Sequence, residues 1–87
     1  MSDPLQTNIT RIVEYVRSVA ILAPSQEIPL DRSLVEAGIF DSFAVVEMLT
    51  FLETTFRLTI AEKDVTREKL GSIQKMANYV LGHQQSS

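Results

Sequence analysis

The sequence has no cysteine, no tryptophan and only one histidine in 87 residues. The absence of cysteine excludes a disulfide framework, a thiolate zinc site and a thiol nucleophile within the chain. The one histidine, His83, lies in a polar segment near the C-terminus, where it is poorly placed to assist a catalytic serine or to bind a metal. The composition therefore argues against an enzyme, and we expect no catalytic residues and no metal site.

Basic residues and long apolar runs are also scarce. Lys and Arg number 8 against 11 Asp and Glu, which gives a formal net charge of −3. The chain thus lacks the basic surface that nucleic-acid binding requires. No apolar run approaches the roughly 20 residues of a membrane-spanning helix, and residues 1–4 have no signal-peptide pattern. We therefore expect a cytoplasmic protein with no nucleic-acid partner and no membrane span.

The residues that are present indicate one small globular domain. Hydrophobic residues make up 45% of the chain and charged residues 22%, which are proportions typical of a folded domain. A chain of this length has room for one core. We expect a single domain over residues 1–87, with an ordered core at about 4–82 and a polar tail at 83–87.

Apolar residues recur at three- and four-residue steps in two long segments, which is the spacing of an amphipathic helix. The first helix is expected over about residues 5–20, with Asp3 as its N-cap and Pro4 in its first turn. The second helix is expected over residues 42–56. Its apolar stripe should face the core through Leu49, Leu52 and Phe56.

The C-terminal part of the sequence predicts two further helices. A short one is expected around residues 65–70, where it is broken by Gly71. Ser72 can then cap a last long helix. We expect Gly82 to end that helix.

A long segment, residues 21–41, separates the first two helices. Pro24 and Pro29 discourage a continuous helix there, yet the segment is rich in apolar residues. The run 33–36 reads as a capping box and Gly38 as a helix stop, so one helical turn is expected. The sequence therefore predicts an all-α bundle of three main helices and one short helix, with a long ordered loop between helices 1 and 2.

Ser42 lies where this loop ends and the second helix begins. The first turn of a helix offers free backbone N–H groups and the positive end of the helix dipole, which favour an anion such as a phosphate. Serine is also a common N-cap residue. Position alone therefore leaves two interpretations, a helix cap and a modified serine, and it favours the cap.

The end of the loop and the second helix contain a spaced set of residues: Leu34, Glu36, Gly38, Asp41, Ser42, Phe43, Val46, Glu47, Glu53 and Phe56. This pattern resembles the acyl carrier protein family, which includes the peptidyl and aminoacyl carrier proteins. The expected order of helices and loop also matches that family over nearly the whole chain. The resemblance reverses the choice made on position alone and favours Ser42 as the modified serine.

The resemblance implies that a phosphopantetheinyl transferase attaches 4′-phosphopantetheine from coenzyme A to Ser42. Asp41, as the acidic residue of the family's Asp-Ser pair, would help the transferase to engage the site. The attached arm would supply the thiol that the chain lacks and would carry an acyl or aminoacyl group as a thioester. The protein would then be a freestanding monomeric carrier whose partners are the transferase, a loading ligase or acyltransferase, and downstream pathway enzymes.

Several positions depart from the fatty-acid carriers that the chain resembles. Phe43 replaces the commoner Leu, Ala44 stands where an acid is frequent, and Arg57 stands where Gly is usual. Thr54 and Thr55 replace part of an acidic run. These departures favour a specialised or aminoacyl pathway over primary fatty-acid synthesis, because the partners of the fatty-acid carriers dock through basic patches.

The resemblance also places candidate partner contacts on the second helix, at Phe43, Glu47, Thr50, Glu53 and Thr54. Phe43 is either a core residue near the helix start or an exposed docking contact. Glu47 and Glu53 are either partner contacts or ordinary solvated surface. The alternative function is a cofactor-free helical adaptor that binds a partner protein.

Overall fold

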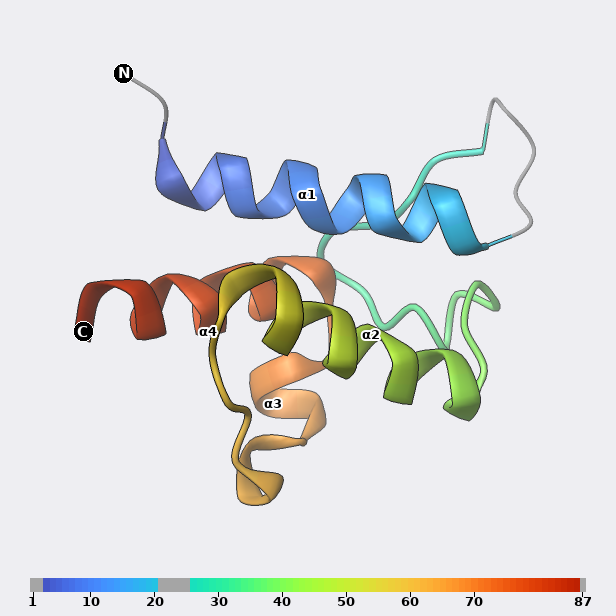
Figure 1. The fold of residues 1–87 in the computed structure, drawn as a ribbon. Coiled ribbons are helices and arrows are strands. Elements are labelled where there is room, and N and C mark those ends of the chain that lie inside the picture. The colour runs from blue at the N-terminus through green and yellow to red at the C-terminus, as the bar shows by residue number, and fades with distance from the viewer. Residues whose placement is uncertain (1–2, 21–25, 87) are drawn as a thin grey trace.

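The computed structural model describes residues 3–20 and 26–86, and in these ranges the chain forms helices and no strand (Figure 1). The long helices are α1 (Pro4–Val19), α2 (Ser42–Phe56) and α4 (Ile73–Ser86). A 3₁₀ turn, η1 (Glu62–Asp64), and a short helix, α3 (Arg67–Leu70), lie between α2 and α4. The expected all-α fold with three main helices and one short helix is confirmed. Residues 21–25, which include Pro24, lie outside the described ranges.

The core forms where α1, α2 and α4 meet. The two side chains with no exposed surface on α1 are Ile12 and Val16. They cluster with the equally buried Leu52, Ile73 and Val80. Met48 is also buried, whereas Leu49 and Phe56, which were expected in the core, are only half-buried. The core stripe of α2 therefore runs through Met48 and Leu52, and the expected face was rotated slightly from the one observed.

The described part of the long loop is ordered by its apolar residues. Ile28, Leu34 and Phe40 are buried in the same core as the helices. The loop is also joined to the first turn of α4, where the Gln74 N–H donates to the Leu30 carbonyl at 2.8 Å. Burial of these side chains explains why a connection rich in apolar residues folds back onto the bundle.

Within the loop, residues 33–38 form one hydrogen-bonded turn. Ser33 Oγ accepts a hydrogen bond from the Glu36 N–H, which is half of the expected capping box. Gly38 has a φ of 78°. It ends the turn with two bonds, from Gly38 N–H to the Val35 carbonyl and from Ile39 N–H to the Leu34 carbonyl. This pair of bonds is the Schellman arrangement, which needs a left-handed residue at the position of Gly38.

The C-terminal helix corrects one expectation, because α4 continues through Gly82 to Ser86. A buried Asn8 on α1 donates through Nδ2 to Gln84 Oε1 at 3.0 Å. The His83 ring packs at a tilt against the ring of Tyr79, one turn earlier, with the ring centroids 4.5 Å apart. These contacts stabilise the last turn and outweigh the low helix propensity of glycine. They also bring the beginning of α1 and the end of α4 together, at the end of the bundle away from the beginning of α2 (Figure 1).

None of the helices in the described ranges is long and apolar enough to cross a membrane.

Arg57 ends α2 in the left-handed conformation, with φ and ψ both at 54°. This conformation costs a residue with a Cβ atom about 1–2 kcal/mol, whereas glycine adopts it freely. We expect Arg57→Gly to raise the free energy of unfolding by about 0.5–1 kcal/mol in urea titrations, after allowance for the greater flexibility of glycine in the unfolded chain.

Gly38→Ala is the matched control, because Gly38 also has a positive φ and a Cβ atom there would meet nothing within 4 Å. It should lower the free energy of unfolding through backbone strain alone. A loss of stability in Arg57→Gly would contradict the prediction and would mean that the arginine side chain outweighs its backbone strain.

Candidate functional site

Asp41, and not Ser42, is the N-cap of α2. Its Oδ1 accepts a hydrogen bond from the Ala44 N–H at 2.8 Å, and its carbonyl accepts one from the Val45 N–H at 3.1 Å. Ser42 is the first residue of the helix and is exposed. The interpretation of Ser42 as a helix cap is therefore wrong, because the neighbouring aspartate already fills that role.

Within the described residues, the hydroxyl of Ser42 makes no hydrogen bond to another part of the chain. Three other serines have described side chains, and each bonds to the backbone. Ser18 donates to the Tyr15 carbonyl, while Ser33 and Ser72 accept from the N–H groups of Glu36 and Lys75. Ser42 Oγ has no such bond within the described residues. It is the serine in this set whose oxygen is both exposed and free to be modified.

The start of α2 also suits a phosphate attached to Ser42. The first N–H groups of a helix have no partner within the helix. Asp41 occupies the one on Ala44, and those of Ser42 and Phe43 have no partner in the described part of the chain. Together with the dipole of a helix of 15 residues, they favour a negative group. The residues present at this helix start therefore fit a phosphodiester arm.

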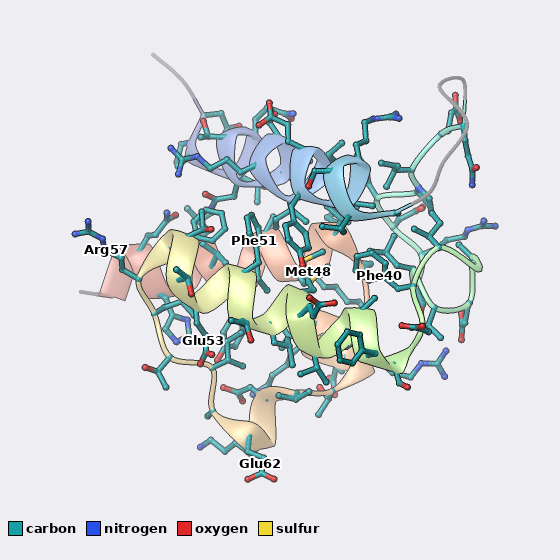
Figure 2. The ribbon with its side chains drawn as sticks, turned by 45° about the vertical axis from the view of Figure 1, so that its right-hand side comes forward. Phe40, Met48, Phe51, Glu53, Arg57 and Glu62 are labelled. Atoms are coloured by element: carbon teal, nitrogen blue, oxygen red, sulfur yellow. The ribbon has the colours of Figure 1, made fainter. Side chains whose placement is uncertain are left out.

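The position of Ser42 is fixed by the residues that precede it. Phe40 is buried, and its N–H donates to the Leu34 carbonyl at 3.1 Å. Phe40 thus joins the end of the loop to the core only two residues before the serine (Figure 2). The loop end is therefore packed against the core immediately before the site.

The expected partner contacts lie in different environments. Phe43 is 71% exposed, so it is a surface residue and not part of the core. Glu47, Thr50 and Thr54 are also exposed on α2. Val46, which the apolar pattern of the helix placed toward the core and not among the partner contacts, is 60% exposed. The exposed face of α2 next to Ser42 therefore combines two apolar side chains, Phe43 and Val46, with one acid, Glu47.

Glu53 has a role inside the molecule. It is half-buried, and its Oε2 accepts a hydrogen bond from the Ile60 N–H at 3.0 Å. Its carbonyl accepts another from the Leu58 N–H at 3.2 Å. Glu53 thus connects the end of α2 to the segment that leads to η1 (Figure 2). Part of its hydrogen-bonding capacity is already used by the fold.

Glu47 lies close enough to α1 to affect Tyr15. Partial burial and, next, the negative charge of Glu47 raise the pKa of the Tyr15 hydroxyl. The Tyr15 ring stacks on Phe51 of α2 with the ring centroids 4.1 Å apart. Glu47 is thus the acidic residue on the exposed face of α2, at the edge of its contact with α1.

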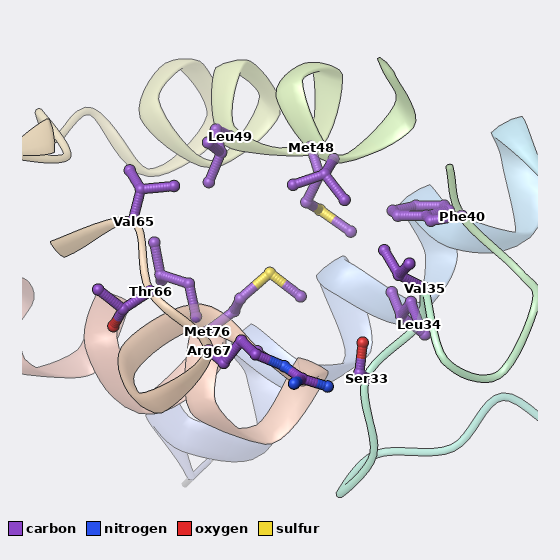
Figure 3. Close-up of a pocket in the computed structure, with 13 residues that line it drawn as sticks. Ser33, Leu34, Val35, Phe40, Met48, Leu49, Val65, Thr66, Arg67 and Met76 are labelled. Carbon is purple, nitrogen blue, oxygen red and sulfur yellow. The ribbon is translucent and has the colours of Figure 1, made fainter. Parts of the chain in front are cut away.

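A pocket of about 220 Å³ opens between α2, the loop and α3 (Figure 3). Its buried end is formed by Leu34, Phe40, Met48 and Met76. Its walls are apolar except for Ser33, Thr66 and Arg67. The oxygens of Ser33 and Thr66 accept backbone hydrogen bonds from Glu36 and Lys69. The sequence reasoning missed this pocket, because its lining comes from separate segments that no single periodicity brings together.

The segment from η1 to α3, of which residues 65–67 and Leu70 line the pocket, is joined to α4 by polar contacts. Lys69 Nζ and the Tyr79 hydroxyl donate to the two oxygens of Asp64 at 2.6 and 2.8 Å. These hydrogen bonds, first that of Lys69 and then that of Tyr79, lower the pKa of Asp64. Lys75 Nζ on α4 also donates to the Arg67 carbonyl at 3.1 Å. The short α3 is therefore fastened to the bundle at both ends.

Comparison with known proteins identifies the family. Residues 10–80 match the family model described as the phosphopantetheine attachment site. No curated protein and no solved structure gave a match. The family model covers most of the chain, with all of α2 and parts of α1 and α4, and its members are carriers of 4′-phosphopantetheine and not catalysts. The chain therefore belongs to the phosphopantetheine attachment site family, as the sequence resemblance to acyl carrier proteins predicted.

Proposed function

We propose that 4′-phosphopantetheine is attached to Ser42 and that the chain carries an acyl or aminoacyl group on it between enzymes of a biosynthetic pathway. The observation that supports this site best is the exposed hydroxyl at the first position of α2, which makes no hydrogen bond within the described residues and lies beside a cap that Asp41 already provides. When bound, the arm supplies the thiol to which the cargo is joined as a thioester. Intact mass after incubation with coenzyme A, magnesium and a promiscuous transferase tests the attachment.

The residues at the start of α2 have distinct parts in this proposal. Ser42 Oγ provides the oxygen of the phosphodiester. The N–H groups of Ser42 and Phe43 and the helix dipole stabilise its negative charge. Asp41 keeps the first turn of the helix in place and presents a carboxylate to the transferase.

Asp41→Asn and Asp41→Ala separate these two roles of Asp41. Asparagine is as good an N-cap as aspartate, while alanine at the cap costs about 1 kcal/mol. We expect Asp41→Ala alone to lower the free energy of unfolding, and both variants to be modified more slowly because both lack the carboxylate. Urea titration and the initial rate of arm transfer measure the two effects. A normal transfer rate in Asp41→Asn would mean that Asp41 acts only as the N-cap of α2 and that its carboxylate does not assist the transferase.

The pocket beside α2 supports an acyl cargo over a charged aminoacyl one. Its buried end consists of aliphatic, aromatic and methionine side chains. An ammonium group placed there would lose its hydration without gaining a partner, whereas an alkyl chain gains from leaving water. Met48 and Met76 are flexible enough to adapt to chains of different shape. The volume, below that of typical drug-sized sites, suits a short or medium chain.

Partner enzymes are proposed to dock on the exposed face of α2. An enzyme that acts on a group attached at Ser42 must cover the adjacent surface, where Phe43 and Val46 are the largest exposed apolar side chains. The low density of acidic residues on this face supports a specialised pathway over primary fatty-acid synthesis, because Glu53 is partly engaged by Ile60. The loading ligase or acyltransferase and the later enzymes would all use this face of a monomeric, cytoplasmic carrier.

Phe43→Ala and Glu47→Lys test this surface through loading kinetics with the cognate enzyme. We expect both to slow loading without a change in thermal stability, because both side chains are exposed. The effect of Glu47→Lys should shrink as salt rises, whereas that of Phe43→Ala should persist, because apolar contact is not screened.

Val19→Ala is the matched control, since Val19 is 51% exposed but lies on α1. It should load normally. Normal loading of Phe43→Ala and Glu47→Lys would instead place the docking surface elsewhere, with the loop as the next candidate.

A further inference from the structure

The entrance of the pocket has two sides that come from separate parts of the chain. One side is the turn 33–38, where Val35 is 49% exposed although it lines the pocket. The other is the segment 65–67, where Val65 is 44% exposed and also lines the pocket. Each side is attached to the core below the entrance, the first through Leu34 and the second through the contacts of Asp64. The entrance is therefore the part of the pocket that can widen.

An ion pair connects the two sides across this entrance. Glu36 in the turn pairs through Oε1 with Nη2 of Arg67 at the start of α3. Both side chains are exposed. In Figure 3 the Arg67 side chain extends along the pocket toward Ser33 and the turn. Among the described residues that line the pocket, Arg67 carries the one charge.

We propose that Glu36 is a specificity-determining residue. By pairing with Arg67 it keeps the entrance closed over an uncharged acyl chain. It also neutralises the positive charge of Arg67, to which the carboxylate of a carboxylate-ended chain would otherwise bind. The proposal rests on the proposed function, in which the pocket takes the cargo. Glu36 itself need not touch the cargo. It acts through the position and the charge of Arg67.

Two consequences follow from the chemistry of the pair. An exposed ion pair is weak, so the entrance opens readily and cargo can leave when an enzyme docks. In the pair, the positive charge of Arg67 is also already matched by the carboxylate of Glu36. A carboxylate-ended chain would then have to lose its hydration beside apolar walls with no free cation to bind. The pocket should therefore prefer an alkyl chain that ends in a methyl group.

The test compares two cargoes of equal length on the full chain. Octanoyl and suberyl arms, the second ending in a carboxylate, are placed on Ser42 from their coenzyme A thioesters by a promiscuous transferase, with intact mass to verify loading. Cleavage of each thioester by hydroxylamine measures how well the pocket shelters the chain, and methyl NMR of Met48 and Met76 reports whether the chain is inside. The variants are Glu36→Gln, Arg67→Gln and the exchanged pair Glu36→Arg with Arg67→Glu.

For the parent protein we expect octanoyl loading to shift the Met48 and Met76 signals, and the octanoyl thioester to be cleaved more slowly than the suberyl thioester. Glu36→Gln should raise octanoyl cleavage about twofold to fivefold, the range expected for loss of an exposed pair. The same variant should slow suberyl cleavage, because Arg67 becomes free to bind the carboxylate. Arg67→Gln should speed octanoyl cleavage without protecting suberyl, and the exchanged pair should restore the octanoyl rate.

Glu68→Gln is the matched control, since Glu68 is an exposed acid on α3 beside Arg67; it should behave like the parent. High salt should remove the difference between Glu36→Gln and the parent. Equal cleavage ratios in the parent and Glu36→Gln would overturn the role of Glu36 while leaving carriage on Ser42 intact. Methionine signals unmoved by octanoyl would overturn both the cargo site and this inference.

The pair itself can be tested without any cargo. A double-mutant cycle of Glu36→Gln and Arg67→Gln in urea should give a favourable coupling between the two residues in the unloaded chain. Zero coupling would show that the two sides of the entrance are not joined, whatever the outcome of loading. Failure of the arm to attach would instead appear in the intact mass and would overturn the proposed function.

Discussion

Ser42→Ala is expected to abolish the addition of 4′-phosphopantetheine while the helices remain folded. The variant removes the oxygen that would form the phosphodiester. It removes no hydrogen bond, because Ser42 Oγ makes none within the described residues, and it leaves the cap from Asp41 in place. Intact mass after incubation with coenzyme A and a promiscuous transferase measures the addition, and circular dichroism measures the helix content.

Ser33→Ala and Ser72→Ala are the matched controls. Each removes a serine whose oxygen accepts a backbone hydrogen bond, so each should cost some stability and still accept the arm. Addition to Ser42→Ala at the parent's rate would move the attachment to another residue and would remove the basis of the proposed site.

Leu52→Ala is expected to lower the free energy of unfolding by about 2–5 kcal/mol, the usual range for a buried leucine. Leu52 has no exposed surface and packs in the core with Ile12, Val16, Ile73 and Val80. A domain of this size has about 5 kcal/mol or slightly more to lose. The variant should therefore be partly unfolded near physiological temperature, as urea titration and melting curves can show.

Leu49→Ala gives the comparison within the same helix. Leu49 is half-buried beside the pocket, so its truncation should cost clearly less than that of Leu52. If Leu49→Ala destabilised the chain as much as Leu52→Ala, the orientation of α2 on the core would have to differ from the one described.

The main helices could be predicted because each has an apolar stripe and a recognisable start. Asp3 caps α1 with Pro4 in its first turn, as expected, and α2 has the expected bounds. The predicted end of α4 was wrong because glycine ends a helix only where tertiary contacts do not outweigh its low helix propensity. Here the contact between Asn8 and Gln84 does so, and a pair separated by 76 positions leaves no local signal.

The candidate site was predicted in part, for a similar reason. Ser42 could be selected by its place before a helix and by its resemblance to a family. Whether Asp41 or Ser42 is the N-cap depends on which residue is the first of the helix. A difference of one residue in that boundary, which the sequence pattern does not resolve, decides between them. The pocket and the pair of Glu36 with Arg67 arise from packing between segments 31 positions apart. Neither could be predicted from the spacing of residues along any one helix.

The contact between Asn8 and Gln84 distinguishes the two ends of the helical bundle. It joins the beginning of α1 to the end of α4 at one end of the bundle, and α2 begins toward the other end (Figure 1), with Ser42 as its first residue. The residues that line the pocket all lie between positions 33 and 76, so α1 and the last turns of α4 take no part in it. A dye, a solid support or a second protein joined at either end of the chain should therefore leave Ser42, the proposed attachment site, open to the transferase.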